Sequence, residues 1–220
     1  MCIYEYKKGF TLSEVLITLV IIGIISSVTI PALITNTQKK EFVAGLKKAN
    51  SVLSQSLYKI ALNNGYPIGD YSFLSEVNFI DEFATISNYE KKCNNTEDCF
   101  GTSLNNGGKY KRLNNTDAVY EDGKSIVSSD GQIFSYINVT GNAWGLSTEN
   151  TQKTIGRILV DVNGQKKPNK TGLDLFLFYV LSDKGIVPAG FDDVSDCNIY
   201  NLGYTCAAKV LNENEINYVR

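Results

Sequence analysis

The sequence has 220 residues, of which 43% are apolar and 20% charged, a composition typical of one compact domain with an appendage. It contains no histidine, which excludes serine–histidine and cysteine–histidine nucleophile sites, imidazole acid–base catalysis and the commonest zinc and haem ligands. Lysine and arginine total 21 against 23 aspartates and glutamates, a net charge of −2, so nucleic acid is not an expected partner by default.

An apolar segment occupies residues 10–34 and carries Glu14 as its one formal charge. A helix of this length, at about 1.5 Å per residue, is long enough to cross a hydrocarbon core of about 30 Å. The segment therefore predicts a transmembrane helix. Residues 1–9 precede it as a short polar stretch that ends in Lys7, Lys8 and Gly9.

Three interpretations of this amino terminus compete. A cleaved secretory signal needs a small-x-small site just after the apolar run, but Ile30 and Pro31 interrupt the best window, residues 26–32. A plain anchor gives no reason for Glu14, because an ionised carboxylate in hydrocarbon costs about 3 kcal/mol even on lenient scales. The third interpretation is a leader that is cut off ahead of the apolar run.

Residues 7–14, with the sequence KKGFTLSE, favour this third interpretation. They resemble the KGFTLxE signature of type IV prepilins and type II secretion pseudopilins. The resemblance implies that a membrane prepilin peptidase cuts after Gly9 and that the new amino terminus, Phe10, is N-methylated. Residues 1–9 would then be the prepilin leader peptide.

The same resemblance assigns Glu14 a role in subunit assembly. After cleavage, the charged amine of Phe10 lies at the edge of an apolar helix, and the Glu14 carboxylate of a neighbouring subunit can pair with it when both are buried. Gly23 and Pro31 lie where many members of the family have residues that loosen this helix, and proline lacks the amide hydrogen that an unbroken helix uses.

Downstream of the apolar run, the hydrophobic positions become periodic. They recur at intervals of three and four residues, which predicts one buried face of an amphipathic helix over residues 35–65. The helix is expected to end at Asn63, Asn64 and Gly65, before Pro67. The periodic positions are Phe42, Leu46, Ala49, Leu53, Leu57 and Ile60.

The remainder, residues 66–220, is expected to form an extracytoplasmic globular head rich in β-structure. Residues 76–89 are a candidate helix, and Asp122-Gly123 and Asp130-Gly131 are candidate hairpin turns. The fold predicted is α+β and pilin-like, with the long amino-terminal helix packed on an antiparallel sheet. The expected strands are Ala118–Glu121, Lys124–Ser128, Gln132–Val139, Arg157–Val162 and Asp174–Leu181.

Four cysteines of the head form two close pairs, Cys93 with Cys99 and Cys197 with Cys206. Five and eight intervening residues suit two local disulfides in an exported domain. Free thiols and a four-thiolate zinc site are the alternatives.

The connection from residue 161 to residue 174 clusters oxygen-bearing side chains that could surround calcium: Asp161, Asn163, Asn169 and Asp174. It lacks the glycine and the closing glutamate of an EF-hand. Asp and Asn side chains that cap their own backbone in a tight turn explain the same residues without an ion, and this interpretation is favoured. We therefore expect no cofactor, with calcium as the minority hypothesis.

The leading hypothesis is a bacterial structural subunit, and not an enzyme, of a type IV pilus or a type II secretion pseudopilus. Its expected partners are the prepilin peptidase, other pilin or pseudopilin subunits, an inner-membrane assembly platform and membrane lipid. The precursor would cross the inner membrane once, and the mature chain would enter a filament in the periplasm or at the cell surface. The alternatives are a minor tip pilin used for adhesion or DNA uptake, and a membrane-anchored enzyme.

Overall fold

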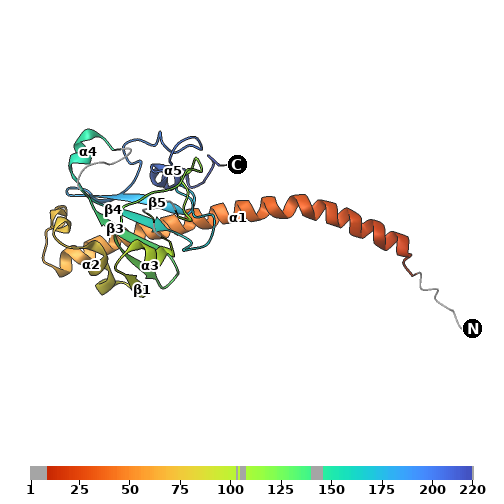
Figure 1. Cartoon of the computed structure of the whole chain (residues 1–220), viewed down its shortest axis with the longest axis horizontal. Coiled ribbons are helices and arrows are strands. Elements are labelled where there is room, and N and C mark those ends of the chain that lie inside the picture. The colour runs from red at the N-terminus through yellow and green to blue at the C-terminus, as the bar shows by residue number, and fades with distance from the viewer. Residues whose placement is uncertain (1–8, 103, 105–107, 140–145, 220) are drawn as a thin grey trace, which may run out of the picture. The chain divides into compact units, whose positions relative to one another are not determined.

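The computed structural model describes residues 9–102, 104, 108–139 and 146–219 (Figure 1). The chain divides into two compact units, residues 1–38 and residues 39–220. Most of the predicted leader lies outside the described residues. The two units are treated separately below.

A single helix, α1 (Leu12–Asn63), supplies most of the described part of the first unit and continues into the second. Gly9 and Phe10 precede it without regular secondary structure. The helix is continuous through Gly23 and Pro31, so the loosening expected at these two positions stays a prediction. A Cβ atom added at Gly23 would meet no atom of the described residues within 4 Å, so packing among them does not require a glycine there.

In the second unit, α1 provides one wall of the hydrophobic core. The predicted periodic face is confirmed, and the helix ends at Asn63, followed by Gly65 at a φ of +72°. Close approach to the sheet is visible at Gly45, where a Cβ atom would lie 3.0 Å from that of Val162. The buried apolar side chains of α1 are Phe42, Val43, Leu46, Ala49, Leu53, Leu57, Ile60 and Ala61.

The head contains one antiparallel sheet of six strands, whose spatial order follows their order in the sequence, β1 to β6 (Figure 1). This meander confirms the predicted α+β class. Four of the five expected strands are present, Lys124–Ser128 with the expected ends and the other three with shifted ends. The strands are β1 (Tyr89–Cys93), β2 (Lys124–Ser128), β3 (Ile133–Asn138), β4 (Thr154–Asp161), β5 (Leu175–Leu181) and β6 (Gly185–Pro188).

Both faces of the sheet are buried, which the alternation of side chains in β5 makes clear. Phe176, Phe178 and Val180 join the cluster that contains the buried face of α1. Leu177 and Tyr179 join a second cluster on the opposite face. The described residues of segments 93–120 and 189–204 supply the outer side of this second cluster, so the head has three layers: helix, sheet and covering segments.

The prediction of a strand at Ala118–Glu121 is wrong, and Asp122-Gly123 does not form a hairpin turn. Ala118 and Tyr120 are buried in the second cluster as part of the covering loop. The Asp122 carboxylate accepts hydrogen bonds from the backbone nitrogen and the hydroxyl of Thr96, each at 2.7 Å. The sheet edge beside β2 is occupied by β1 instead. In contrast, Asp130-Gly131 does join β2 to β3, with Gly131 at a φ of +86°.

Short helices pack around the sheet, and the helix expected over residues 76–89 is reduced to one of them, since Tyr89 already begins β1. The region from residue 66 to residue 115 contains three of these elements and β1. The short helices are η1 (Ser72–Ser75), α2 (Phe79–Ile86), α3 (Thr96–Phe100), α4 (Thr148–Gln152) and α5 (Cys206–Glu213).

Both predicted cysteine pairs are disulfides in the structure, Cys93–Cys99 and Cys197–Cys206. The first pair belongs to the cluster under the loops, and the second to the cluster on the side of α1. Each therefore fixes a local loop to a different face of the sheet.

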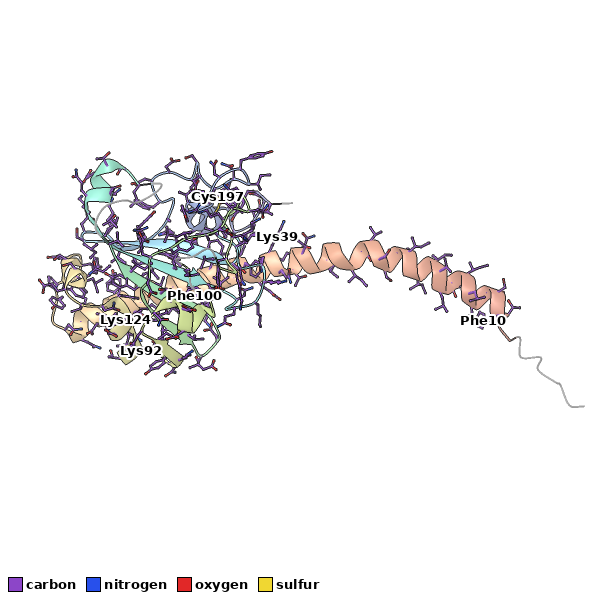
Figure 2. All side chains as sticks on the ribbon, in the orientation of Figure 1. Phe10, Lys39, Lys92, Phe100, Lys124 and Cys197 are labelled. Carbon is purple, nitrogen blue, oxygen red and sulfur yellow. A yellow bond between two sulfur atoms is a disulfide. The ribbon has the colours of Figure 1, made fainter. Side chains whose placement is uncertain are left out.

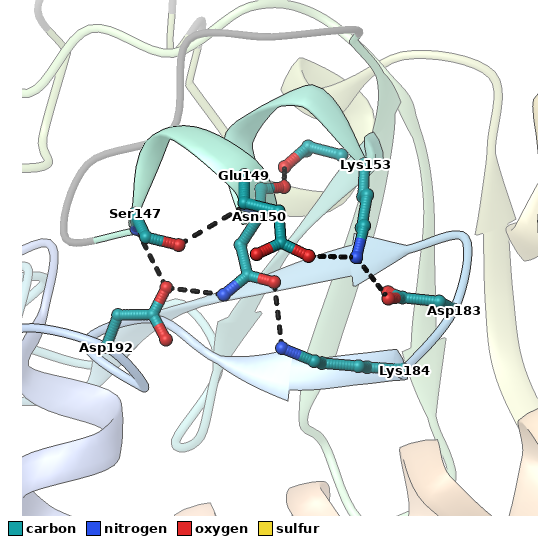
Figure 3. A network of polar contacts seen from close by, with 8 residues as sticks. Ser147, Glu149, Asn150, Lys153, Asp183, Lys184 and Asp192 are labelled. Atoms are coloured by element: carbon teal, nitrogen blue, oxygen red, sulfur yellow. Dashed lines mark hydrogen bonds and ion pairs between the residues drawn. The ribbon is translucent and has the colours of Figure 1, made fainter.

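A polar network holds α4 against the β5–β6 turn (Figure 3). Asp192 accepts hydrogen bonds from the Ser147 backbone nitrogen at 2.8 Å and from Asn150 Nδ2 at 2.6 Å. Lys184 donates to Asn150 Oδ1 at 2.8 Å, and Lys153 pairs with Asp183 at 2.8 Å. Because these groups bind one another, we assign the network a structural role: it holds α4 and the β5–β6 turn together.

The position of Leu53 in the core gives a direct test of the head's packing. Leu53→Ala should lower the free energy of unfolding by about 3 kcal/mol, because it leaves a cavity between α1 and the sheet. Leu62→Ala is the matched control, because Leu62 lies on the same helix but is 63% exposed. It should change the free energy of unfolding by less than about 0.5 kcal/mol. Denaturant unfolding of the detergent-solubilised chain measures both, and equal losses would contradict the packing described here.

Candidate functional site

The bond between Gly9 and Phe10, where the resemblance places cleavage, lies just ahead of α1. Both residues are exposed, Phe10 to 89%, and neither is held in a helix or strand. A peptidase needs an accessible segment that can extend into its site, and this one meets that requirement.

Glu14 forms a reciprocal set of hydrogen bonds with Thr11 at the start of α1. Its Oε2 atom accepts from the Thr11 backbone nitrogen and from the Thr11 hydroxyl, each at 2.8 Å. The Glu14 backbone nitrogen donates to Thr11 Oγ1 at 3.3 Å. This arrangement is a capping box, which satisfies amide groups that an isolated helix start leaves without partners. The T-x-x-E spacing at residues 11–14 could have predicted it, but the sequence reasoning considered only the charge of Glu14.

The apolar side chains of α1 between Leu12 and Leu33 project from the helix and are exposed (Figure 2). Contiguous apolar surface of this extent marks a membrane or protein contact. Among the described residues, α1 is the one helix long and apolar enough to span a membrane, with a mean hydropathy of 2.5 in its most apolar window. A shallow depression of about 210 Å³ at its start is lined by Phe10, Glu14, Val15 and Thr18.

Hydroxyl groups within the apolar stretch are bonded inside the helix. Thr18 donates to the Val15 carbonyl at 2.9 Å, and Ser27 donates to the Ile24 carbonyl at 2.7 Å. The Thr29 hydroxyl likewise donates to the Ile25 carbonyl, one turn earlier, at 3.0 Å. These polar side chains therefore need no water, which suits an apolar environment.

The second predicted cluster lies in the connection between β4 and β5. The structure brings Asp161 and Asp174 together, because the pairing of these strands places Asp161 opposite Leu175. Both carboxylates are fully buried. Asn163 and Asn169 belong to the same connection, and the Asn169 side chain is also buried.

Part of this cluster caps its own backbone, as the favoured interpretation expects. Asp161 accepts from the Asn163 backbone nitrogen at 3.2 Å, and Asp174 accepts from those of Asn169 and Lys170 at 2.7 and 2.6 Å. A further partner, which no sequence pattern predicts, is the Tyr110 hydroxyl: it donates to Asp161 at 2.5 Å from a distant loop.

The electrostatics of the two aspartates are unusual. Burial, and then the nearby charge of Asp174, raise the pKa of Asp161 well above its ordinary value. Burial raises the pKa of Asp174 to about 6. In the part of the chain that the structure describes, no group of three or more Cys, Asp or Glu side chains is placed to hold a metal ion. A calcium site here would need the asparagine oxygens as well.

A surface depression of about 350 Å³ lies at the end of the head where α1 stops. It is lined by residues 66–76, including the stacked rings of Tyr66 and Phe73. Its Asp70 carboxylate accepts from the Ser72 backbone nitrogen and hydroxyl at 3.0 and 2.6 Å, and these bonds lower the pKa of Asp70. Asp70 thus acts as a turn-capping acceptor.

Comparison with known proteins matches the amino terminus to one family. Residues 6–30 match the family described as the prokaryotic N-terminal methylation motif. Neither the curated proteins nor the solved structures compared with the chain give a match. The motif and the exposed apolar helix fit a precursor anchored in the inner membrane. The amino terminus of this chain therefore carries the N-terminal methylation motif that is the signal of type IV pilins and pseudopilins.

Proposed function

We propose that this protein is a structural subunit of a bacterial type IV pilus or type II secretion pseudopilus. The observation that carries the proposal is the combination of the methylation motif with an exposed apolar helix whose first turn holds one carboxylate. That helix cannot remain in water, since each fully exposed Leu, Ile or Val side chain forgoes about 1.5–3 kcal/mol of burial. Membrane lipid would cover it in the precursor, and other subunits would cover it in the filament.

Maturation begins at the Gly9–Phe10 bond. Prepilin peptidase cuts after Gly9, and N-methylation then modifies the amine of Phe10. The exposure of both residues and their position outside α1 support this step. The new amine lies within one helical turn of Glu14, at the same end of the apolar segment.

Glu14 then joins one subunit to the next. Both Thr11 bonds fall on Oε2, and among the described residues no hydrogen bond falls on Oε1. Oε1 can accept the amine of a neighbouring Phe10 while Oε2 keeps its capping bonds. Each charge then compensates the other in a site without water, and the pair fixes the axial register of adjacent subunits.

The wider assembly follows from this role. The assembly platform in the inner membrane would extract the mature chain from lipid, and the head would remain outside the cytoplasm. The two disulfides agree with an oxidising compartment. A major subunit should be abundant in sheared filaments, whereas a minor tip subunit would be scarce there.

The cleavage site can be tested by intact-mass and amino-terminal peptide analysis of the protein from cells with and without their prepilin peptidase. The expected mature chain begins at N-methylated Phe10, and only when the peptidase is present. A chain that still begins near Met1 in both strains, or that is cut beyond Ala32, would contradict the proposal.

The proposed role of Glu14 in subunit pairing can be tested separately from its role in capping the helix. Glu14→Gln keeps a capping partner for Thr11 but removes the charge, because glutamine also serves in a capping box. We expect this variant to be cleaved normally and to reduce filament yield at least about tenfold, the factor equivalent to 1.4 kcal/mol per subunit contact. Quantitative immunoblotting of sheared filaments and of membranes measures the yield and the cleavage.

The matched control is Thr11→Ala, which removes the hydroxyl cap and keeps the charge. It should assemble much better than Glu14→Gln. If the two variants assemble equally well, or if Glu14→Gln forms filaments at the wild-type level, Glu14 acts through helix capping alone and the proposed pairing is wrong.

A further inference from the structure

The surface depression at the end of α1 is acidic. Its volume is about 350 Å³, and the residues that line it include Asp70 and Glu76 but no lysine or arginine. Both carboxylates are exposed, and in the described part of the chain neither forms an ion pair. Both Ser72 bonds fall on Asp70 Oδ1, so Oδ2 and the Glu76 carboxylate keep their capacity to accept. We call this depression the acidic groove.

An aromatic stack also lines the acidic groove. Tyr66 and Phe73 lie with their ring centroids 4.1 Å apart and their planes within 5° of parallel. Phe73 is buried, so the stack fixes the position of the Tyr66 ring, which is 37% exposed. The aliphatic part of a lysine side chain packs well on such a ring while its ammonium group reaches a nearby carboxylate. The groove therefore has the chemistry to bind lysine side chains.

Two lysines without a partner lie on α1 near the other end of the head. Lys40 and Lys47 are exposed, and among the described residues neither amine forms a hydrogen bond or an ion pair. Their spacing is about two helical turns, so both project from the same side of α1, with a rise of about 10 Å between them. We call this pair the lysine face.

We propose that the acidic groove of one copy of this chain binds the lysine face of a second copy. Two carboxylates match two ammonium groups, and neither set has another charged partner in the described chain. Within one copy the two surfaces cannot meet, because the stretch of α1 from Lys47 to Asn63 is about 24 Å long. The contact rests on the proposed filament function, which brings copies together, and it adds a contact between heads to the pairing of Glu14.

A contact of this kind also determines how copies are arranged. Because the groove and the lysine face are different surfaces, the interface is heterologous, and such an interface forms an open helical array when it does not close into a ring. The midpoint of the lysine face lies about 30 Å along α1 from Asn63. Copies joined in this way, with parallel α1 helices, would be displaced by about 30 Å along the helix.

The first test uses the unaltered protein. A carbodiimide links a lysine amine to a carboxylate where the two groups are in direct contact. In sheared filaments it should produce covalent dimers, and peptide mass spectrometry should identify a link from Lys40 or Lys47 to Asp70 or Glu76. The same reagent should give no such link in the monomeric chain in detergent.

Charge reversal tests whether the contact supports assembly. Lys40→Glu with Lys47→Glu makes the lysine face negative. Asp70→Asn with Glu76→Lys makes the groove positive, and asparagine keeps an oxygen to accept the Ser72 bonds. Each pair of substitutions should lower the yield of sheared filaments at least about fivefold, because repulsion replaces attraction. The chain with all four should regain much of that yield, since the two surfaces again have opposite charges.

The matched controls are Glu90→Lys in β1 and Lys109→Glu in the segment that follows α3. Both side chains are exposed, and both lie outside the acidic groove and the lysine face. These controls should assemble like the wild type. Immunoblots of membranes should show normal amounts and normal cleavage for every variant, which separates assembly from maturation.

Three outcomes would overturn the proposal. If wild-type cells form no filaments, this contact fails together with the proposed function. If filaments form but give no link between the two surfaces, the contact alone is wrong. If reversal of the lysine face lowers the yield but the groove variant neither lowers it nor restores it, the lysines act on another partner, such as anionic lipid headgroups.

Discussion

The structure depends on one constraint, the apolar surface of α1 between Leu12 and Leu33. The large apolar side chains described in this stretch are exposed, whereas the later part of the same helix buries its apolar face in the head. A helix that is apolar on all sides needs lipid or other copies of itself around it. In the proposed filament, the single carboxylate at its start would make this general attraction specific, because a buried charge admits only a neighbour that brings the opposite charge to the same depth.

In the proposed assembly the head meets a different requirement, since it would have to stay folded while its helix leaves a membrane. Its sheet is covered on both faces, by α1 on one and by loops on the other, and a disulfide fixes each side. Salt bridges such as Lys48 to Asp130 tie α1 to the β2–β3 turn but are exposed and contribute little. Stability therefore comes mainly from the two apolar clusters.

Sequence reasoning succeeded where a local pattern decides the structure. The intervals from Phe42 to Ile60 specify a buried helix face, and Asp130-Gly131 supplies the positive φ that its hairpin needs. It failed at Ala118–Glu121, whose β-like composition serves a loop packed on the sheet, and at Asp122, whose carboxylate binds Thr96 across a long sequence separation. The bond from Tyr110 to Asp161 is likewise a tertiary contact that no spacing reveals. At the amino terminus, the roles predicted for Gly9, Phe10 and Glu14 stay predictions, and the resemblance did not indicate that Thr11 engages Glu14.

The central claim is that the exposed part of α1 becomes the core of a filament and that Glu14 there meets the amine of a neighbouring Phe10. A helical reconstruction of purified filaments at side-chain resolution tests it most directly. The account predicts that residues 12–33 lie in the filament interior and that the amine and a Glu14 oxygen of adjacent subunits lie within about 3 Å, the length of a charge-assisted hydrogen bond. A filament whose subunits contact each other only through their heads, or in which Glu14 faces solvent, would contradict it.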